Sequence, residues 1–270
     1  MQNRTSDVQT AGAVHEHLDL ERYPLEQPRR CQSLIDRCLE ELATLGLCSL
    51  PGFVRPATIA RAAEELLPLV HEQSFFHSRL HNIYFTDTPS HIAADHPALA
   101  LQETSGRTVC DDQITWSIIH DLYEWPPLRG FLARIMGKPR LHLMEDPLAR
   151  VNVMGYRAGE GLGWHFDRSE FTTTLLIQAP QDGGHLEYRP DLAQDDLDGV
   201  ASLLEGRDAA KRTHVQQAGT LSVFRGRNTA HRVIPVVGET DRLVAVFSYF
   251  DRPGVVFSAA ERQGFYGRAT

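Results

Sequence analysis

The sequence is poor in basic residues and has no long apolar run. Its 27 lysines and arginines are outnumbered by 35 acidic residues, which gives a formal net charge of -8. A protein that binds nucleic acid needs a basic surface to neutralise phosphates, so this balance argues against a nucleic-acid partner. No stretch of about 18 apolar residues occurs, and the first twenty residues contain no apolar segment of signal-peptide length. We therefore expect no membrane span and a cytoplasmic location.

Cysteine is scarce as well. The four cysteines (Cys31, Cys38, Cys48 and Cys110) form no CxxC pair and have no zinc-ligand spacing, so we expect reduced thiols. The remaining composition, with 42% hydrophobic and 23% charged residues, is ordinary for a globular protein. A chain of 270 residues is long enough for one substantial core with a helical annex. Composition indicates no oligomeric state.

The first half of the chain has helical periodicity. Residues 1–28 are polar and aperiodic, which predicts a flexible tail. Residues 29–140 are expected to form a helical part that packs on the core, although the interval 74–112 shows no period and is expected to form loops near a pocket entrance. Apolar residues at helical spacing predict three helices, over 31–45, over 56–71 and from the Pro126-Pro127 pair to Gly137.

The second half has the texture of a β protein. Short apolar segments bounded by Gly, Pro, Asp or Asn predict strands at 141–145, 149–157, 171–178, 185–189, 219–225, 231–237 and 242–250, with one earlier strand at 47–53. So many short strands favour a barrel or jelly roll. We expect a mainly β fold in which residues 141–253 form the core, 191–217 an irregular insertion and 254–270 a C-terminal extension.

Three His-x-[Asp/Glu] motifs occur, and only one has a context suited to a metal. His17-Leu18-Asp19 lies in the expected tail, and Glu187 of His185-Leu186-Glu187 is as well explained as a surface strand residue. His165-Phe166-Asp167 lies between a glycine turn and a strong strand. An isolated histidine is more often a hydrogen-bonded structural residue than a ligand. The motif alone is therefore a weak signal.

The spacing of its residues strengthens the case for His165-Phe166-Asp167 as a metal site. Residues i and i+2 of an extended segment point to the same side, so His165 and Asp167 can face one interior together. His231 opens a later predicted strand and can complete the set. Two imidazoles and one carboxylate on one face of an iron ion leave three positions open for chemistry. The pattern predicts a non-haem iron centre.

Arg242 follows His231 by eleven residues and opens the apolar strand Arg-Leu-Val-Ala-Val-Phe. A charged residue at the start of a buried strand either reaches solvent or pairs with an anion. The guanidinium fork suits a carboxylate bidentately. Because Arg242 comes soon after an expected metal ligand, we favour the anion.

The motifs together resemble the Fe(II)/2-oxoglutarate-dependent oxygenase superfamily. The resemblance covers about 145–253 and rests on the segments Trp164-His165-Phe166-Asp167, Gly183-Gly184-His185-Leu186-Glu187-Tyr188, Gly219-Thr-Leu-Ser-Val-Phe, His231-Arg232-Val233 and Asp241-Arg242-Leu243. It implies a double-stranded β-helix (jelly roll, cupin-like) core with helices packed against it. Within the superfamily, the segments resemble the bacterial branch of free-amino-acid hydroxylases and halogenases.

The resemblance implies that His165, Asp167 and His231 bind Fe(II). It also implies that Arg242 holds the distal carboxylate of 2-oxoglutarate, the co-substrate consumed with O2. Halogenases of this branch have Gly or Ala in place of the carboxylate ligand, which frees a position for chloride. Here Asp167 is present, so we predict hydroxylation of an unactivated C–H bond in a small molecule, most consistent with an amino acid or a derivative of one.

Three further residues are candidates for the co-substrate site. Asn152 and Tyr156 share a face of the strand 149–157 and are placed to hydrogen-bond 2-oxoglutarate, but a cross-strand polar pair explains them equally well. Thr174 shares a face of the next strand with Thr172, although threonine is common in strands.

Three residues near the ligands are candidates for substrate contact. Arg168, beside Asp167, suits an acidic group of the substrate or remains solvated. Trp164 walls the pocket or packs in the core. Asn228, just before His231, lies at the pocket rim, where turn chemistry explains it equally well.

Two other functions are compatible with the pattern. A non-catalytic or 2-oxoglutarate-independent cupin-like protein would bind metal without forming succinate. A halogenase would incorporate halide in spite of Asp167.

Overall fold

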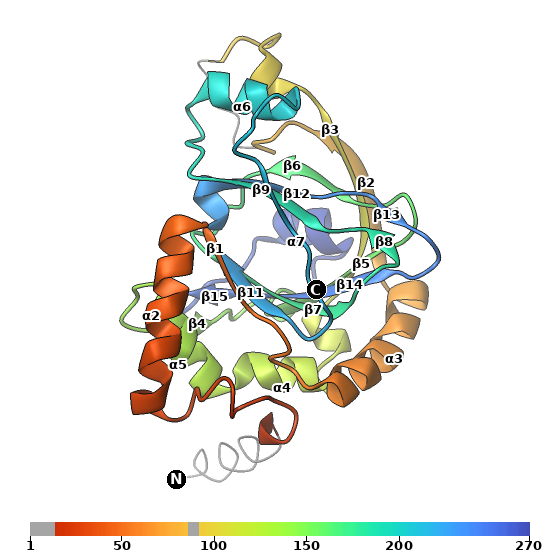
Figure 1. Cartoon of the computed structure of the whole chain (residues 1–270). Helices are drawn as coiled ribbons and strands as arrows, with labels where there is room; N and C mark the ends of the chain where they lie inside the picture. The colour runs from red at the N-terminus through yellow and green to blue at the C-terminus, as the bar shows by residue number, and fades with distance from the viewer. Residues whose placement is uncertain (1–13, 86–91) are drawn as a thin grey trace.

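Two antiparallel sheets face each other across the interior of the molecule (Figure 1). The computed structural model describes residues 14–85 and 92–270. The larger sheet has the order β1 (Leu47–Leu50), β11 (Leu221–Phe224), β7 (Thr172–Gln178), β14 (Arg242–Phe247), β5 (Val151–Tyr156), β3 (Gln102–Val109) and β2 (Phe75–His81). The smaller sheet has the order β10 (Arg212–His214), β9 (Leu186–Pro190), β12 (Thr229–Val233) and β6 (Leu162–His165). This is the predicted jelly roll.

Alternation along the larger sheet separates a uniformly apolar outer face from an inner face that carries both polar and apolar residues. In β5, Val151 and Val153 belong to the main hydrophobic cluster, whereas Asn152 and Tyr156 point to the other side. In β14, Leu243 and its alternate neighbours join the same outer cluster. Arg242 therefore lies on the inner face, opposite Tyr156 in the register. The inner face looks toward the smaller sheet.

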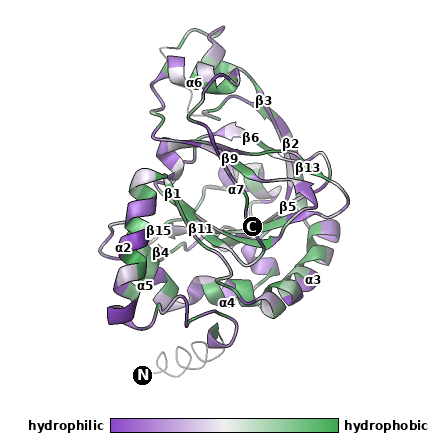
Figure 2. Ribbon diagram, viewed as in Figure 1, coloured by the Kyte–Doolittle hydropathy of each residue, from purple (hydrophilic) through white to green (hydrophobic). Residues whose placement is uncertain are grey.

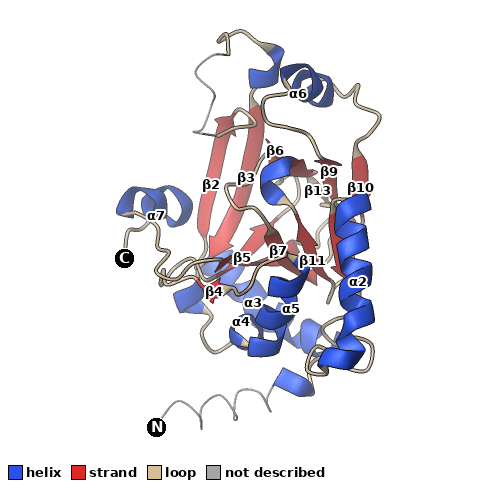
Figure 3. Cartoon of the chain, turned by 90° about the vertical axis from the view of Figure 1, so that its left-hand side faces the viewer, coloured by secondary structure: helices blue, strands red, loops and turns tan. Residues whose placement is uncertain are grey.

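Helices cover the outer face of the larger sheet. They are α2 (Pro28–Thr44), α3 (Pro56–Glu72), α4 (Ile118–Glu124) and α5 (Pro126–Ile135), as Figures 1 and 3 show. Their apolar residues form one cluster with the outward strand residues, and Figure 2 shows the hydrophobic colour concentrated between these layers. Helices were predicted over 31–45, over 56–71 and from Pro126, and all three are confirmed within a few residues.

The prediction of loops over 74–112 is wrong for 75–81 and 102–109, although no long element lies in the described residues between them. This interval contains β2 and β3, which pair antiparallel along their whole length and extend the larger sheet at one edge. β2 is largely exposed, with only His81 buried among its seven residues. An edge strand with polar residues on both faces gives no apolar alternation to read in the sequence.

The prediction of a flexible tail over 1–28 is wrong for its described part. Val14, Leu18 and Tyr23 are each at most 2% exposed and belong to the main hydrophobic cluster. Leu18 also forms a β-bridge with Val54. Residues 1–13 lie outside the described part of the chain.

The packing of this segment gives a stability prediction. Leu18→Ala should lower the free energy of unfolding by about 2–5 kcal/mol, because it removes a fully buried side chain and leaves a cavity. Urea denaturation measures the loss, with Glu21→Ala, an exposed neighbour, as the matched control. If the two variants were equally stable, Leu18 would contribute nothing to the core, as expected for a flexible tail.

Smaller elements complete the fold. The expected insertion 191–217 holds α6 (Leu197–Leu204) and β10, while 3-10 turns occur at Pro97–Leu99, Asp111–Gln113 and Gly226–Asn228. Two-residue strands form the pairs β4 (His142–Leu143) with β15 (Tyr249–Phe250) and β8 (Asp182–Gly183) with β13 (Val236–Val237). Among the described residues, every helix is too short or too polar to cross a bilayer.

The C-terminal extension contains α7 (Ala259–Tyr266), which lies beside β2 and β3 at one end of the jelly roll (Figure 3). Two buried contacts hold it there. The Tyr266 hydroxyl donates to the side-chain oxygen of Asn152 at 3.0 Å, and Arg262 pairs with the fully buried Asp146 at 2.8 Å. The helix is therefore part of the folded core region and not a loose extension.

Candidate functional site

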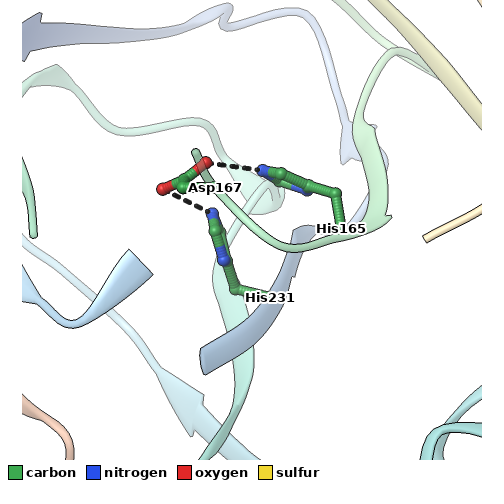
Figure 4. A group of neighbouring side chains, drawn as sticks. All are labelled: His165, Asp167 and His231. Atoms are coloured by element: carbon green, nitrogen blue, oxygen red, sulfur yellow. Dashed lines mark ion pairs between the residues drawn. The ribbon is translucent and has the colours of Figure 1, made fainter. Parts of the chain in front are cut away.

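His165, Asp167 and His231 converge in the interior, as Figure 4 shows. One ligand atom of each lies within 4.8 Å of the others. His165 is the last residue of β6, and His231 is its direct partner across the β6–β12 pair, with ring centroids 4.0 Å apart. Asp167 follows β6 by two residues. Pairing of two neighbouring strands thus brings together residues distant in the sequence.

Backbone carbonyls fix the tautomers of both histidines. Nδ1 of His165 lies 2.9 Å from the Gly163 carbonyl oxygen, and Nδ1 of His231 lies 2.9 Å from that of Thr229. A carbonyl only accepts, so each Nδ1 carries a hydrogen, and in the neutral form of the ring Nε2 then has the lone pair. The Nε2 atoms face Asp167, at 3.4 and 3.5 Å from its carboxylate oxygens. This is how histidine ligands are commonly oriented toward a metal.

The protonation states also suit a cation. Burial and the neighbouring His165 lower the pKa of His231 to about 4, so its ring is neutral at pH 7. Burial alone would raise the pKa of Asp167, but His231, His165 and the Thr172 hydroxyl together lower it below its ordinary value. Two imidazoles and one carboxylate are the donor set that suits a ferrous ion with open positions.

Aromatic rings enclose the histidines. The ring of Phe85 lies 5.3 Å from that of His165, and the ring of Phe224 lies 4.7 Å from that of His231. Phe85 has a φ of 52°, a conformation that bulky residues rarely adopt and that is often kept near functional sites. Sequence reasoning missed Phe85 and gave no role to Phe224, which ends the Gly219-Thr-Leu-Ser-Val-Phe segment. Phe85 follows β2 in the interval misread as loops, where no pattern distinguishes it.

Arg242 is buried in the interior, and none of the described acidic residues pairs with it. It is 5% exposed, and its Nη1 has no hydrogen-bond partner among the described residues. Its guanidinium carbon lies 5.7 Å from the centroid of the Tyr156 ring. Burial lowers the pKa of Arg242, although Tyr156 opposes this. An unpaired buried charge is costly, so this guanidinium is suited to an anionic ligand such as a carboxylate.

Glycine provides the room beside Arg242. A Cβ on Gly184 would lie 3.2 Å from Cδ of Arg242 and 2.8 Å from the Pro180 ring, and its φ of +59° also favours glycine. The Gly183-Gly184 segment noted in the sequence thus lets the backbone approach this side chain closely.

The other candidates for the co-substrate site differ in position. Tyr156 is 2% exposed and lies beside Arg242, and Thr174 is on the same inner face, opposite Val246. Asn152 is on this face as well, but its amide donates to the Leu148 carbonyl at 2.7 Å and accepts from Tyr266. Its polar groups are therefore used to hold the chain and α7, which departs from the expected co-substrate contact.

The substrate candidates are also separated by the structure. Arg168 pairs with Glu261 of α7 at 2.7 Å. Asn228 is exposed at the end of a 3-10 turn, close in sequence to His231. Trp164 belongs to a hydrophobic cluster with residues of α6, and Arg232 lies over its ring. Since neighbouring strand residues point to opposite faces, Trp164 points away from the side that His165 faces, so the suggested wall of the pocket is a packing residue.

The His185-Leu186-Glu187 motif is not part of the cluster. Glu187 pairs with Lys211 at 2.5 Å and with Arg232, its partner on the neighbouring strand β12, at 2.6 Å. Glu187 is only 8% exposed, so the surface position suggested by the sequence is wrong, but these two cations satisfy its carboxylate.

The comparisons agree with this architecture. The family model of Halogenase D matches residues 32–255, which is most of the chain. No curated protein matches the chain. Among solved structures, the non-heme alpha ketoglutarate dependent epimerase SnoN from nogalamycin biosynthesis has a TM-score of 0.55 and 16% identity, covering 81% of this chain and 83% of that chain.

Two further structures have the same fold. An oxidoreductase of the 2OG-Fe(II) oxygenase family from Burkholderia pseudomallei has a TM-score of 0.52 and 15% identity, covering 82% of this chain and 92% of that chain. A prolyl hydroxylase from Trichoplax adhaerens has a TM-score of 0.53 and 14% identity, covering 83% and 92%. The chain therefore belongs to the Halogenase D family and has the fold of the Fe(II)/2-oxoglutarate-dependent oxygenases.

Proposed function

We propose that this enzyme hydroxylates an unactivated C–H bond of a small metabolite, an amino acid or a derivative of one, using Fe(II), 2-oxoglutarate and O2. The buried guanidinium of Arg242, which has no acidic partner in the described chain and faces the sheet that bears the His-Asp-His cluster, carries the proposal. A metal cluster alone fits any cupin-like protein. The unpaired guanidinium adds a binding position for a dicarboxylate.

Each residue has a distinct task in this proposal. His165, Asp167 and His231 hold the iron, with both imidazole hydrogens already committed to backbone carbonyls. Arg242 binds the far carboxylate of 2-oxoglutarate, with Tyr156 and Thr174 beside it on the inner face. Bound iron and 2-oxoglutarate supply the oxidation of the C–H bond by O2. Phe85 and Phe224 limit the access of water to the histidines.

An acidic group on the substrate is supported by a cation, Arg79, near the metal cluster. The guanidinium of Arg79 lies over the Phe85 ring at 4.8 Å, and the same ring contacts His165. Arg79 forms no ion pair within the described chain, and burial and nearby Arg168 lower its pKa. His77 lies on the same side of β2, and burial and Arg79 lower its pKa to about 4, so it is neutral at pH 7. These groups suit a carboxylate.

The role of Arg79 is testable through the choice of substrate. Arg79→Leu should raise the KM for an acid substrate roughly tenfold, because a hydrogen bond to a charged group is worth about 1.5 kcal/mol or more. The amide of the same compound should react equally with both enzymes, and Arg79→Lys should recover part of the difference. Steady-state kinetics on the acid and its amide measure this. An unchanged preference for the acid would remove Arg79 from the substrate site.

Halogenation is the second candidate, favoured by the description of the family as Halogenase D. By the resemblance, halogenases lack the carboxylate ligand, whereas Asp167 lies between the two histidines here. Reactions run with chloride and with bromide distinguish the two. We expect products heavier by one oxygen and free of halogen in both salts, and a halogenated product would overturn the assignment.

The general test is succinate formation over a panel of amino acids, with Fe(II), 2-oxoglutarate and O2 supplied. The proposal expects succinate that rises with one class of substrate, together with a product that has gained one oxygen. A cupin-like protein without this activity would bind metal but form no succinate. That outcome, or a failure to bind 2-oxoglutarate, would end the proposal.

A further inference from the structure

The carboxylate of Asp167 is held from outside the metal cluster by the hydroxyl of Thr172. Thr172 Oγ1 donates a hydrogen bond to Asp167 Oδ2, the oxygen that also lies 3.5 Å from His231 Nε2. The hydroxyl of Ser169 lies 3.3 Å from that of Thr172. No other hydroxyl contacts Asp167 within the described residues.

This contact crosses between the two sheets. Asp167 lies in the connection that leaves β6 of the smaller sheet, whereas Thr172 is the first residue of β7 in the larger sheet. β7 is an inner strand, paired with β11 on one side and β14 on the other. Its position is therefore fixed by hydrogen bonds on both edges. The Thr172 hydroxyl therefore ties Asp167, which lies in a connecting segment, to the rigid strand β7.

Asp167 is the member of the cluster that most needs such support. Its side chain is 21% exposed, against 5% for each histidine. Each histidine is on a strand and has a ring nitrogen bound to a carbonyl, whereas the described backbone contact of Asp167 is its N–H donating to the Gly226 oxygen at 3.1 Å. Without Thr172, the carboxylate has more freedom to rotate away from the histidines.

Gly226 leaves the space in which this arrangement fits. A Cβ at position 226 would lie 2.6 Å from Asp167 Oδ2 and 2.6 Å from Thr172 Oγ1. Both distances are far below ordinary contact, and both atoms are engaged in the hydrogen bond. Any side chain at 226 would push the carboxylate or the hydroxyl out of place.

We propose that Thr172 is a positioning residue whose hydroxyl holds the Asp167 carboxylate in the orientation that binds the metal, with Gly226 kept small to allow it. The inference rests on the proposed iron site. A partner that hydrogen-bonds a ligating carboxylate typically changes metal affinity by roughly 10- to 100-fold when removed.

The test compares variants of the apo-protein with Co(II) as a redox-stable probe and with no 2-oxoglutarate. Thr172→Val keeps the shape and removes the donor, so Co(II) should bind roughly 10- to 100-fold more weakly, measured by calorimetry. Thr172→Ser keeps the hydroxyl and should bind within about threefold of wild type. Thr173→Val is the matched control, since Thr173 is buried on the other face of the same strand.

Three more measurements separate positioning from folding. The melting temperature of the apo-protein should be similar in Thr172→Val and Thr173→Val, while the visible spectrum of bound Co(II) should change only in Thr172→Val. Thr172→Ala replaces Thr172→Val if the larger side chain prevents folding. Gly226→Ala should weaken Co(II) binding as well, because its methyl group collides with the carboxylate.

The outcomes distinguish this inference from the proposed function. Wild-type affinity in a folded Thr172→Val or Thr172→Ala protein overturns the positioning role and leaves the iron site standing. Failure of the wild-type protein to bind Co(II) overturns both. Weakening in the valine variant with rescue by serine supports the inference.

Discussion

Asp167→Ala should lose metal binding and, with it, all succinate formation. The substitution removes the charged ligand and leaves two neutral imidazoles, which are a poor site for a ferrous ion. The loss of affinity should exceed the roughly 10- to 100-fold that removal of a hydrogen-bonded neighbour costs. Calorimetry with Co(II) and an assay of succinate release measure the two effects.

His185, which lies outside the metal cluster, provides the control for this experiment. His185 belongs to the His185-Leu186-Glu187 motif and not to the cluster, so the His185→Ala variant should bind Co(II) as the wild-type protein does. His231→Ala should behave like Asp167→Ala, since both residues contribute to one site. Metal binding at wild-type affinity in Asp167→Ala would mean that the ion is held elsewhere.

Arg242→Leu should lose the binding of 2-oxoglutarate while it keeps the metal. Removing one member of a buried, hydrogen-bonded charge pair costs about 2–5 kcal/mol, which weakens binding by roughly 30-fold to more than 1000-fold. Titration of the Co(II)-loaded protein with 2-oxoglutarate measures the change. Arg242→Lys keeps the charge but not the planar fork, so it should bind 2-oxoglutarate with an intermediate affinity.

Arg242→Leu should weaken the binding of 2-oxoglutarate but should not lower the stability of the protein without ligands. Arg242 lies among Tyr156, Val244 and other apolar residues of the inner face, and its Nη1 has no partner in the described chain. Leucine removes an uncompensated buried charge, so the melting temperature of the apo-protein should stay equal or rise. Arg232→Leu is the control, because that arginine has an acidic partner, Glu187, on the neighbouring strand of the smaller sheet. A destabilised Arg242→Leu with normal 2-oxoglutarate affinity would make Arg242 a structural residue.

The metal cluster was readable from the sequence because its geometry is mostly local. His165 and Asp167 are two residues apart in an extended segment, and alternation puts such residues on one side. Their position after a glycine turn and the later His231 and Arg242 gave a pattern that few structural alternatives explain. Alternation also placed Arg242 on the inner face of an otherwise apolar strand.

The contacts that hold the metal cluster in place could not be predicted from the sequence. Thr172 was grouped with Thr174 because they share a face of one strand, but only Thr172 reaches Asp167. Asn152 has the same alternation as Tyr156, yet its amide is taken up by Leu148 and Tyr266. Alternation gives the face of a strand and not the partner that another segment brings to it.

The sequence by itself determined the jelly-roll class, three of the four helices that cover it, and the residue types at the proposed metal and carboxylate positions. These follow from local periodicities of two and about 3.6 residues, which each segment carries alone. Only the tertiary structure decided that the polar segments at 75–81 and 102–109 form an edge of the main sheet, and that residues 14–27 pack into the core. It also decided that Phe85 and Arg79 lie near His165. Contacts between distant segments depend on how strands pair and how side chains pack, and neither produces a periodic pattern in the sequence of a single segment.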